Sequence, residues 1–251
     1  MKGDRELAYL RQKYYGMFVK MFWKEPDMEF LLSLLDGIAD RVKGSAQISP
    51  LMSEGWKDIR HYLEQKGAVE VEYEFVQLFL GPHQPDIMPY ESYYLSGRFF
   101  QAPLAAVRGF MKEVGLEKKE GQLPEPEDTL GFELEIMNWM ISKQTSAEDS
   151  DTEEKWIDLQ ARFLKDHLLV WGPECAQDIE SAPHAVFYKG TGKLLRGFLE
   201  FEKQVFHDFG PEKIESLDNL RKRYGNRKEW KGPLFEAVPE NKEIPKHKPT
   251  I

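Results

Sequence analysis

Apolar residues recur at steps of three and four along most of this chain, and that spacing restricts its fold more than any other feature. The clearest example is the stretch 127–143, in which Leu130, Leu134, Met137 and Ile141 fall on one helical face. No segment shows sustained two-residue alternation over the length of a strand, and no internal repeat is visible. The sequence therefore predicts an all-α fold, a multi-helix globular bundle.

Several helices have identifiable starts and stops. Asp4 and Asp27 are suited to cap helices, and Ser49-Pro50 is a cap followed by proline at the first helical position. Gly172-Pro173 is expected to end a helix that begins near Trp156. The expected helices cover residues 4–23, 27–44, 50–66, 70–80, 99–114, 127–143, 156–171, 175–180, 183–209 and 214–220.

Length and composition predict one helical domain with a tail. The chain has 251 residues, 41% of them hydrophobic, which suffices for one sizeable core. We expect a single domain over 1–223 and an extended or disordered tail over 224–251, which is rich in Lys, Glu, Pro and Asn. The polar stretch 145–152 is a possible hinge, which would permit exchange of helical halves between chains.

The charge and the single cysteine narrow the classes of partner. A net charge of −9 argues against nucleic acid and suits a basic ligand. Cys175 alone excludes an internal disulfide framework and fits a reducing compartment. The N-terminus lacks the layout of a signal peptide, and no apolar run approaches membrane-spanning length. We therefore expect a cytoplasmic protein without stable membrane insertion.

The stretch from Tyr73 to Tyr94 is the strongest candidate for a recognition surface. It begins as an amphipathic helix, stops at Gly81-Pro82, and continues through a proline-rich loop into Pro89-Tyr90-Glu91-Ser92. Prolines fix φ and restrain the residue before them, so the loop has little freedom to lose when a partner binds. The alternative interpretation is an ordinary helix connection in which Pro-Tyr fills a gap.

These residues also resemble a family signature. Tyr73, Leu78-Phe79, Gly81-Pro82 and Pro89-x-Glu91-Ser92-x-Tyr94 are similar to a motif of the TorD/DmsD/NarJ group, cytoplasmic chaperones that mature molybdenum-containing redox enzymes. Two further segments resemble the group in the same order along the chain, so that the resemblance covers roughly residues 5–209. They are the helix start Glu125-Pro126-x-Asp128-Thr129 with Glu133-Leu134, and Phe163 to Trp171 with Phe187-Tyr188.

The resemblance implies a TorD-like chaperone rather than an enzyme, without a cofactor of its own. It would bind the N-terminal twin-arginine leader, the apo form of a molybdoenzyme catalytic subunit, or both, until cofactor insertion and export or assembly proceed, as a monomer or a dimer. The group usually has histidine where this chain has Thr129, so no role that needs an imidazole there is transferred.

The expected peptide-binding residues combine aromatic side chains with carboxylates, because a leader presents an apolar segment beside arginines. Glu127 and Asp128 have an alternative role, since acidic residues at the start of a helix are stabilised by its dipole. The candidate residues are Tyr73, Phe79, Asp86, Pro89, Tyr90, Glu91, Ser92, Tyr94, Glu125, Asp128 and Thr129.

Other kinds of site fit the sequence less well. The six histidines show no three- or four-residue pairing, and one cysteine cannot build a thiolate zinc site, so no metal is expected. Gly190-Thr-Gly192-Lys193 resembles a phosphate-binding loop but fits better as a bend or close contact within a helix. A hydrolase that uses Ser92 and His83 lacks a nucleophile elbow, and Ser92 fits better as a cap for the following turn. An assembly scaffold that binds a folded surface is a further alternative.

Overall fold

The computed structural model describes residues 5–81, 85–118, 125–207 and 214–224, and these residues form helices joined by short connections, without a β-strand. The predicted all-α fold is confirmed. The elements in chain order are α1 (Arg5–Phe22), α2 (Met28–Ser33), α3 (Ile38–Ser45), α4 (Pro50–Gln65), α5 (Val69–Phe75), the π-helix η1 (Val76–Leu80), α6 (Glu91–Ser96), α7 (Ala102–Glu113), α8 (Leu130–Thr145), α9 (Ser150–Phe163), the π-helix η2 (Leu164–Leu168), α10 (Leu169–Ser181), α11 (Phe187–Val205) and α12 (Leu217–Tyr224).

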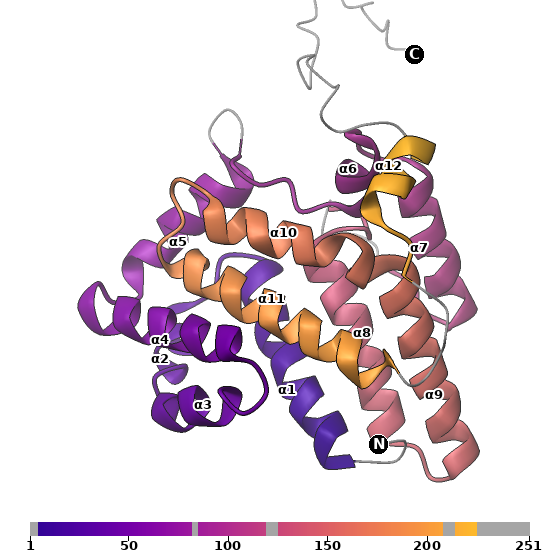
Figure 1. The fold of residues 1–251 in the computed structure, drawn as a ribbon, viewed down its shortest axis with the longest axis horizontal. Coiled ribbons are helices and arrows are strands. Elements are labelled where there is room, and N and C mark those ends of the chain that lie inside the picture. The colour runs from indigo at the N-terminus through magenta and orange to yellow at the C-terminus, as the bar shows by residue number, and fades with distance from the viewer. Residues whose placement is uncertain (1–4, 82–84, 119–124, 208–213, 225–251) are drawn as a thin grey trace, which may run out of the picture.

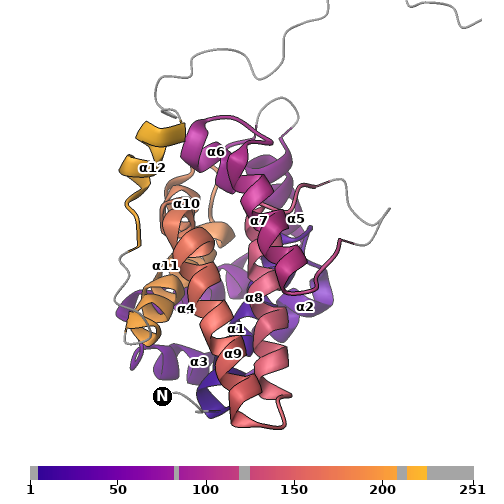
Figure 2. The ribbon, with the colours of Figure 1, turned by 90° about the vertical axis from the view of Figure 1, so that its right-hand side faces the viewer.

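The helices pack around a centre formed by α1, α8, α10 and α11. Figure 1 shows α10 and α11 side by side in front of α1, with α2, α3 and α4 at the lower left, and α11 also packs along α4. Helix α8 contacts both α1 and α9, and Figure 2 shows α8 and α9 running together. No described helix is both long and apolar enough to cross a bilayer.

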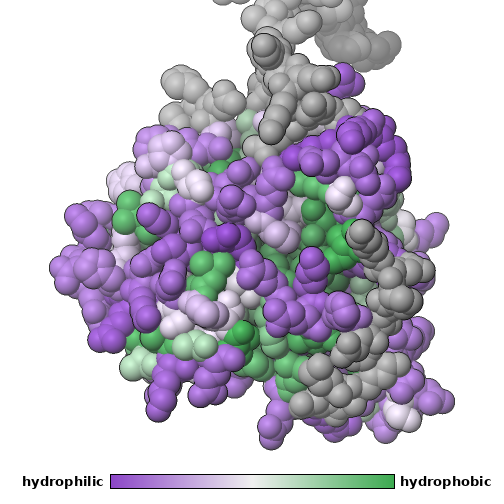
Figure 3. All heavy atoms as spheres, in the orientation of Figure 1, coloured by the Kyte–Doolittle hydropathy of each residue, from purple (hydrophilic) through white to green (hydrophobic). Residues whose placement is uncertain are grey.

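The centre of the core is aromatic. Phe198 of α11 lies against Tyr14, Tyr15 and Phe18 of α1, with ring centroids 5.2, 5.0 and 5.5 Å away. All four side chains are buried. On the face drawn in Figure 3, hydrophilic side chains cover the left part, and apolar ones reach the surface mainly at and to the right of the centre.

Glycines permit the close crossing of α11 with α4 and α10. A Cβ at Gly55 would lie 2.6 Å from the carbonyl oxygen of Gly190, and one at Gly192 would lie 2.8 Å from that of Ala176. Lys193 pairs with Asp58 of α4 at 2.7 Å. The prediction that Gly190 to Lys193 is a close packing contact rather than a phosphate-binding loop is confirmed.

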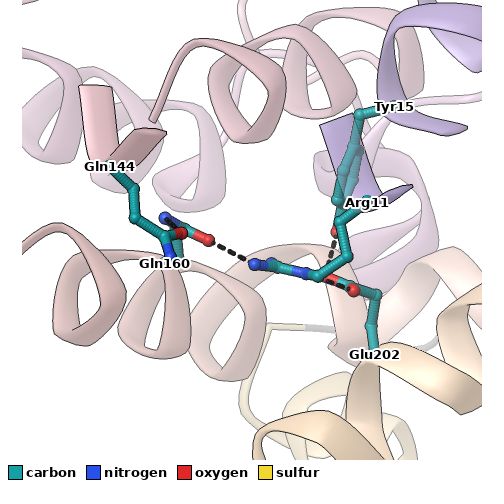
Figure 4. A network of polar contacts seen from close by, with 5 residues as sticks. All are labelled: Arg11, Tyr15, Gln144, Gln160 and Glu202. Atoms are coloured by element: carbon teal, nitrogen blue, oxygen red, sulfur yellow. Dashed lines mark hydrogen bonds and ion pairs between the residues drawn. The ribbon is translucent and has the colours of Figure 1, made fainter. Parts of the chain in front are cut away.

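A buried polar network joins α1 to α8, α9 and α11 (Figure 4). Arg11 forms two hydrogen bonds with Glu202, from Nε at 2.6 Å and from Nη2 at 2.8 Å. Its Nη1 donates to Gln160 at 2.8 Å, and Gln160 donates to Gln144 at 3.0 Å. Tyr15 donates to Glu202 at 2.7 Å. Burial disfavours the charged form of Arg11, but Glu202 offsets this and raises its pKa.

Local signals set some boundaries correctly. Asp27 caps α2 by accepting the N–H of Phe30 at 2.7 Å, and α4 begins at Pro50, as predicted. The single helix expected over 27–44 is wrong, because the chain forms α2 and α3 with Gly37 between them at a φ of +65°. Glycine adopts that left-handed conformation without the steric cost that other residues incur.

The expected helix end at Gly172-Pro173 is also wrong. The chain stays helical from Ser150 through η2 to Ser181 and keeps Pro173 inside α10. Gly172 instead serves packing, since a Cβ there would lie 3.1 Å from Leu199 Cδ1. A π-helical turn just before the proline has already changed the hydrogen-bond pattern of the helix.

The domain boundaries remain predictions. Residues 146–149 connect α8 to α9, and Asp149 caps α9 by accepting the N–H of Thr152 at 2.7 Å. The proposed hinge at 145–152 thus covers the end of one helix and the start of the next. Asp4 and the tail beyond Tyr224 lie outside the described residues.

Candidate functional site

Two of the three family-like segments, the motif of residues 73–94 and the helix start of residues 125–134, lie side by side in the structure. Tyr90 and Thr129 form an isolated antiparallel bridge. Next to it, the backbone N–H of Glu91 donates to the carbonyl oxygen of Asp128 at 2.8 Å. Residues 89–91, which lead into α6, are therefore attached by backbone hydrogen bonds to the segment that starts α8.

Asp128 caps a helix that belongs to the other motif. Its Oδ2 accepts the N–H of Ser92 at 3.0 Å, at the first turn of α6, a helix that the sequence analysis did not predict. Unpaired N–H groups at a helix start need such an acceptor. The prediction that Ser92 caps this turn is wrong, because Ser92 Oγ is buried without a hydrogen-bond partner and Asp128 supplies the cap.

The helix expected to start at Glu127 starts later. Helix α8 begins at Leu130, and Thr129 caps it by accepting the N–H of Phe132 at 3.3 Å. Glu127 pairs with Arg108 of α7 at 2.8 Å. Glu127 and Asp128 thus bind neighbouring elements rather than occupy the first turn of their own helix.

The carboxyl groups of Glu91, Asp128 and Glu133 lie near one another in the interior, next to the Tyr90–Thr129 bridge. Glu91 lies 3.0 Å from Nδ1 of His167, and Glu133 accepts the indole N–H of Trp171 at 3.0 Å. Burial, and then the nearby Glu91 and Asp128, raise the pKa of Glu133 well above its usual range. The exposed fractions of Glu91, Asp128 and Glu133 are 2%, 1% and 0%, so solvent does not screen these groups.

The tyrosines of the first motif also have internal partners. Tyr90 is half-buried, donates its hydroxyl to Glu125 at 2.8 Å, and packs edge-on against Phe99 at 4.9 Å. Burial, and then Glu125, raise the pKa of Tyr90. Tyr94 is buried and donates to Asp178 at 2.9 Å. Pro89 is half-buried.

Other candidates lie nearer the surface. The side chain of Tyr73 is 77% exposed. Asp86 lies at the surface, 2.6 Å from Nδ1 of His184. Phe79 is half-buried, with its ring 5.1 Å from those of Phe75 and Tyr188.

The candidate residues therefore separate into two groups. Glu91, Ser92, Tyr94 and Asp128 are buried, and the carboxylates among them bind internal partners. They do not face solvent as peptide-binding side chains would, because they join helices to one another. The remaining candidates are half-buried or exposed.

An exposed apolar stripe beside this loop was missed. Val69, Tyr73, Val76 and Leu80 of α5 and η1 have exposed fractions of 60, 77, 36 and 51%. Their spacing of four, three and four residues places them on one helical side. That spacing is present in the sequence, but the same helix also carries Phe75 and Leu78 on a buried face, and only the structure shows which apolar face is exposed.

Glu74, also missed, anchors the helix that carries the stripe. Its carboxylate accepts backbone N–H groups from Val186 at 2.8 Å, Phe187 at 3.0 Å and Tyr188 at 2.7 Å, at the start of α11. Burial raises the pKa of Glu74, and these hydrogen bonds oppose the shift. No sequence signal pairs Glu74 with a helix start so distant in the chain.

Comparison with known proteins identifies the family. The sequence profile described as "Nitrate reductase delta subunit" matches residues 45–177, more than half of the 251 residues. The chain belongs to this family.

Comparison with individual proteins agrees with this family membership. "Chaperone protein TorD" of Vibrio cholerae serotype O1 (strain ATCC 39541) is 25% identical over 216 residues, covering 81% of this chain and 96% of that protein. The TorD chaperone of Vibrio vulnificus (strain YJ016) is 30% identical over 137 residues, 53% of this chain and 63% of its own length. That of Aeromonas salmonicida (strain A449) is 29% identical over 129 residues, 51% and 57% respectively. The predicted relationship to TorD-like maturation chaperones is confirmed.

The part that matches the nitrate reductase delta subunit family contains the exposed stripe, the segments 73–94 and 125–134, and His167. In the described part of the chain no group of three His, Cys, Asp or Glu side chains is arranged to hold a metal ion. Ser92, the nucleophile of the alternative hydrolase hypothesis, is 0% exposed, and its proposed partner His83 lies outside the described residues. A substrate has no access to a side chain buried in this way.

Proposed function

We propose that this protein is a cytoplasmic chaperone that binds the twin-arginine leader of a molybdoenzyme catalytic subunit, its apo form, or both. Binding would hold the subunit until its cofactor is inserted and its export or assembly proceeds. Membership of the nitrate reductase delta subunit family and similarity to TorD chaperones support this role. The chemistry of one exposed surface supports it independently.

That surface is the apolar stripe of Val69, Tyr73, Val76 and Leu80, and it carries the proposal. Exposed Glu70 and Glu72 precede Tyr73 in the same helix, and at 100° per residue they lie on opposite sides of the stripe. Asp86 lies at the surface beyond the end of η1. An apolar strip bordered by carboxylates is complementary to a peptide in which arginines stand beside an apolar segment.

The energies fit reversible binding. Burying three or four apolar side chains contributes roughly 5–10 kcal/mol. Ordering a flexible leader costs about 2–5 kcal/mol of that, before the loss of translational freedom. Exposed ion pairs with Glu70, Glu72 or Asp86 add about 0–1 kcal/mol each, so the carboxylates chiefly set specificity and the rate of encounter. A chaperone that must release its client needs such moderate affinity.

In this proposal the buried motif residues position the surface. Asp128 and Glu91 attach the start of α6 to the segment before α8 and to η2. Four half-buried residues lie between these buried contacts and solvent: Pro89, Tyr90, Glu125 and Thr129. We propose that the leader contacts the exposed Tyr73, the surface residue Asp86, whose side chain is 17% exposed, and these half-buried residues.

The test is calorimetric titration with a synthetic peptide that carries two arginines followed by an apolar segment. Tyr73→Ser and Leu80→Ser should each weaken binding about 10-fold, because each removes about 1.5 kcal/mol of apolar contact. Both side chains are exposed, so the melting temperature should stay nearly constant. Tyr9→Ser, at a 50% exposed position on α1, is the matched control and should bind normally.

Two results would contradict the proposal. Unchanged affinity in a folded Tyr73→Ser/Leu80→Ser variant would show that the leader binds elsewhere. A wild-type protein that ignores arginine-containing leaders but captures a folded subunit would be an assembly scaffold instead.

A further inference from the structure

A second concave surface lies away from both motifs and from the apolar stripe. It is a groove of about 920 Å³ formed by α1, α2, α3 and α4. In Figure 1 these helices occupy the centre and lower left of the molecule. The groove shares no residue with the proposed leader surface.

Its walls are largely apolar and aromatic. Met17 and Leu10 of α1 face the groove together with Ile48, which precedes α4. Trp56 and Tyr14 lie deeper and are nearly buried, with the indole N–H donating to the tyrosine hydroxyl at 3.4 Å. A volume of this size is in the range of small-molecule sites, which bury an apolar body against such walls.

The charged residues of the groove are mostly cations. Lys13, Lys20 and Arg41 line it together with one acid, Asp40. The Arg41 guanidinium lies 5.3 Å from the centre of the Trp56 ring and donates to a backbone carbonyl.

These cations lack acidic partners. None of the three forms an ion pair with a described residue, whereas Arg108 and Arg196, for example, are paired with carboxylates. The chain as a whole carries a net charge of −9. Lys20 Nζ lies 5.2 Å from the centre of the Phe30 ring, so Lys20 and Arg41 both lie over aromatic rings of the groove. Three cations that line one apolar groove of an acidic protein without a carboxylate partner indicate an anionic ligand.

We propose that the groove binds a small anionic molecule with an aromatic or aliphatic body. The body packs against Met17, Ile48 and the aromatic floor, and its phosphate, sulfonate or carboxylate group lies toward Lys13, Lys20 and Arg41. Lys and Arg side chains bind such groups through charge-assisted hydrogen bonds. The site is separate from the leader surface and does not depend on leader binding.

The test compares two fluorescent probes of similar shape. The anionic probe is 1-anilinonaphthalene-8-sulfonate, and the neutral one is N-phenyl-1-naphthylamine. Lys13→Gln/Lys20→Gln should lower the affinity for the anionic probe at least 10-fold and leave the affinity for the neutral probe nearly unchanged. Lys66→Gln/Lys203→Gln removes two exposed lysines that do not line the groove, and it should change the affinity for neither probe.

A blocking variant tests the position of the site. Gly44 lines the groove within α3, and a Cβ there meets nothing within 4 Å. The Cβ of Gly44→Leu therefore enters open space at the groove, and leucine favours the helix more than glycine does. This variant should abolish binding of both probes while its melting temperature and leader affinity are preserved.

Each other outcome overturns the proposal. If Gly44→Leu is folded and still binds both probes like the wild type, the probes bind elsewhere. If Gly44→Leu abolishes binding but the two glutamine substitutions do not affect the anionic probe, the groove is an uncharged apolar site. Loss of leader binding in the lysine variants would instead show that these cations serve the leader-binding function.

Discussion

At the scale of single residues, Glu133 shows how burial changes the properties of a carboxyl group. It is 0% exposed, accepts the indole N–H of Trp171 at 3.0 Å, and lies near two further acids. Burial first, and then Glu91 and Asp128, raise its pKa above the ordinary value of 4.5. The protonated form is therefore favoured in the folded protein.

This shift predicts how stability depends on pH. Above the ordinary pKa the unfolded chain releases the Glu133 proton while the folded protein retains it, so the free energy of unfolding falls as pH rises. Glu133→Gln resembles the protonated form and still accepts from Trp171. Its melting temperature should exceed that of the wild type near pH 8 and approach it near pH 4.

Glu135→Gln, half-buried on the same helix, is the control and should not reproduce the pattern. A Glu133→Gln variant that is less stable at every pH would show that the ionised carboxylate is required.

At the scale of elements, helix starts are satisfied by distant side chains. Asp128 caps α6, and Glu74 accepts the first N–H groups of α11. Each contact fixes one helix against another, so residues 85–90, which lead into α6, are held at a defined position. Their partly exposed side chains, Asp86 and Tyr90, are thereby presented to a partner.

Asp128→Ala and Asp86→Ala should affect different properties, the first stability and the second leader binding. Loss of the α6 cap should lower the free energy of unfolding by about 1–2 kcal/mol. Asp86→Ala removes the contact with His184 and should lower the free energy of unfolding by at most about 1 kcal/mol, the upper value for an ion pair near the surface. It should weaken leader binding by up to about fivefold, since a surface pair with the leader also contributes up to about 1 kcal/mol.

Urea unfolding and calorimetric titration of both variants measure the two effects. Unchanged stability in Asp128→Ala, together with lost leader affinity, would place Asp128 in the binding surface rather than in the anchor.

At the scale of the whole molecule, the Arg11 network joins the N-terminal helix to the last long helix. Arg11 and Glu202 are 3% and 0% exposed, and Gln160 and Tyr15 complete their hydrogen bonds. Such a network stabilises only when every member is satisfied. It links α1, α8, α9 and α11 into one unit.

Removing only one member of the Arg11–Glu202 pair should destabilise the fold. Arg11→Met leaves the Glu202 charge buried without its partner, and should lower the free energy of unfolding by about 3–5 kcal/mol. Arg11→Met/Glu202→Leu removes both charges and should recover part of that loss. Urea unfolding measures both, and a double variant less stable than Arg11→Met would mean that Glu202 contributes through its other partners.

Local patterns in the sequence determined the helical class of this protein, some of its helix starts and its family. The three- and four-residue spacing of apolar side chains predicted the helical class, and Asp27 and Pro50 marked two helix starts correctly. The motifs around Glu91 and Asp128 predicted the family. These signals are readable because each depends on residues within a few turns of one another.

Only the tertiary structure decided which way the motif side chains face. Asp128 and Glu91 were expected to bind a peptide, yet one caps α6 and the other contacts His167. Tyr73, in the same stretch, stays exposed. A carboxylate beside a loop suits a cationic ligand or a helix start equally well. The choice depends on which distant element packs against it, and residue spacing does not encode that.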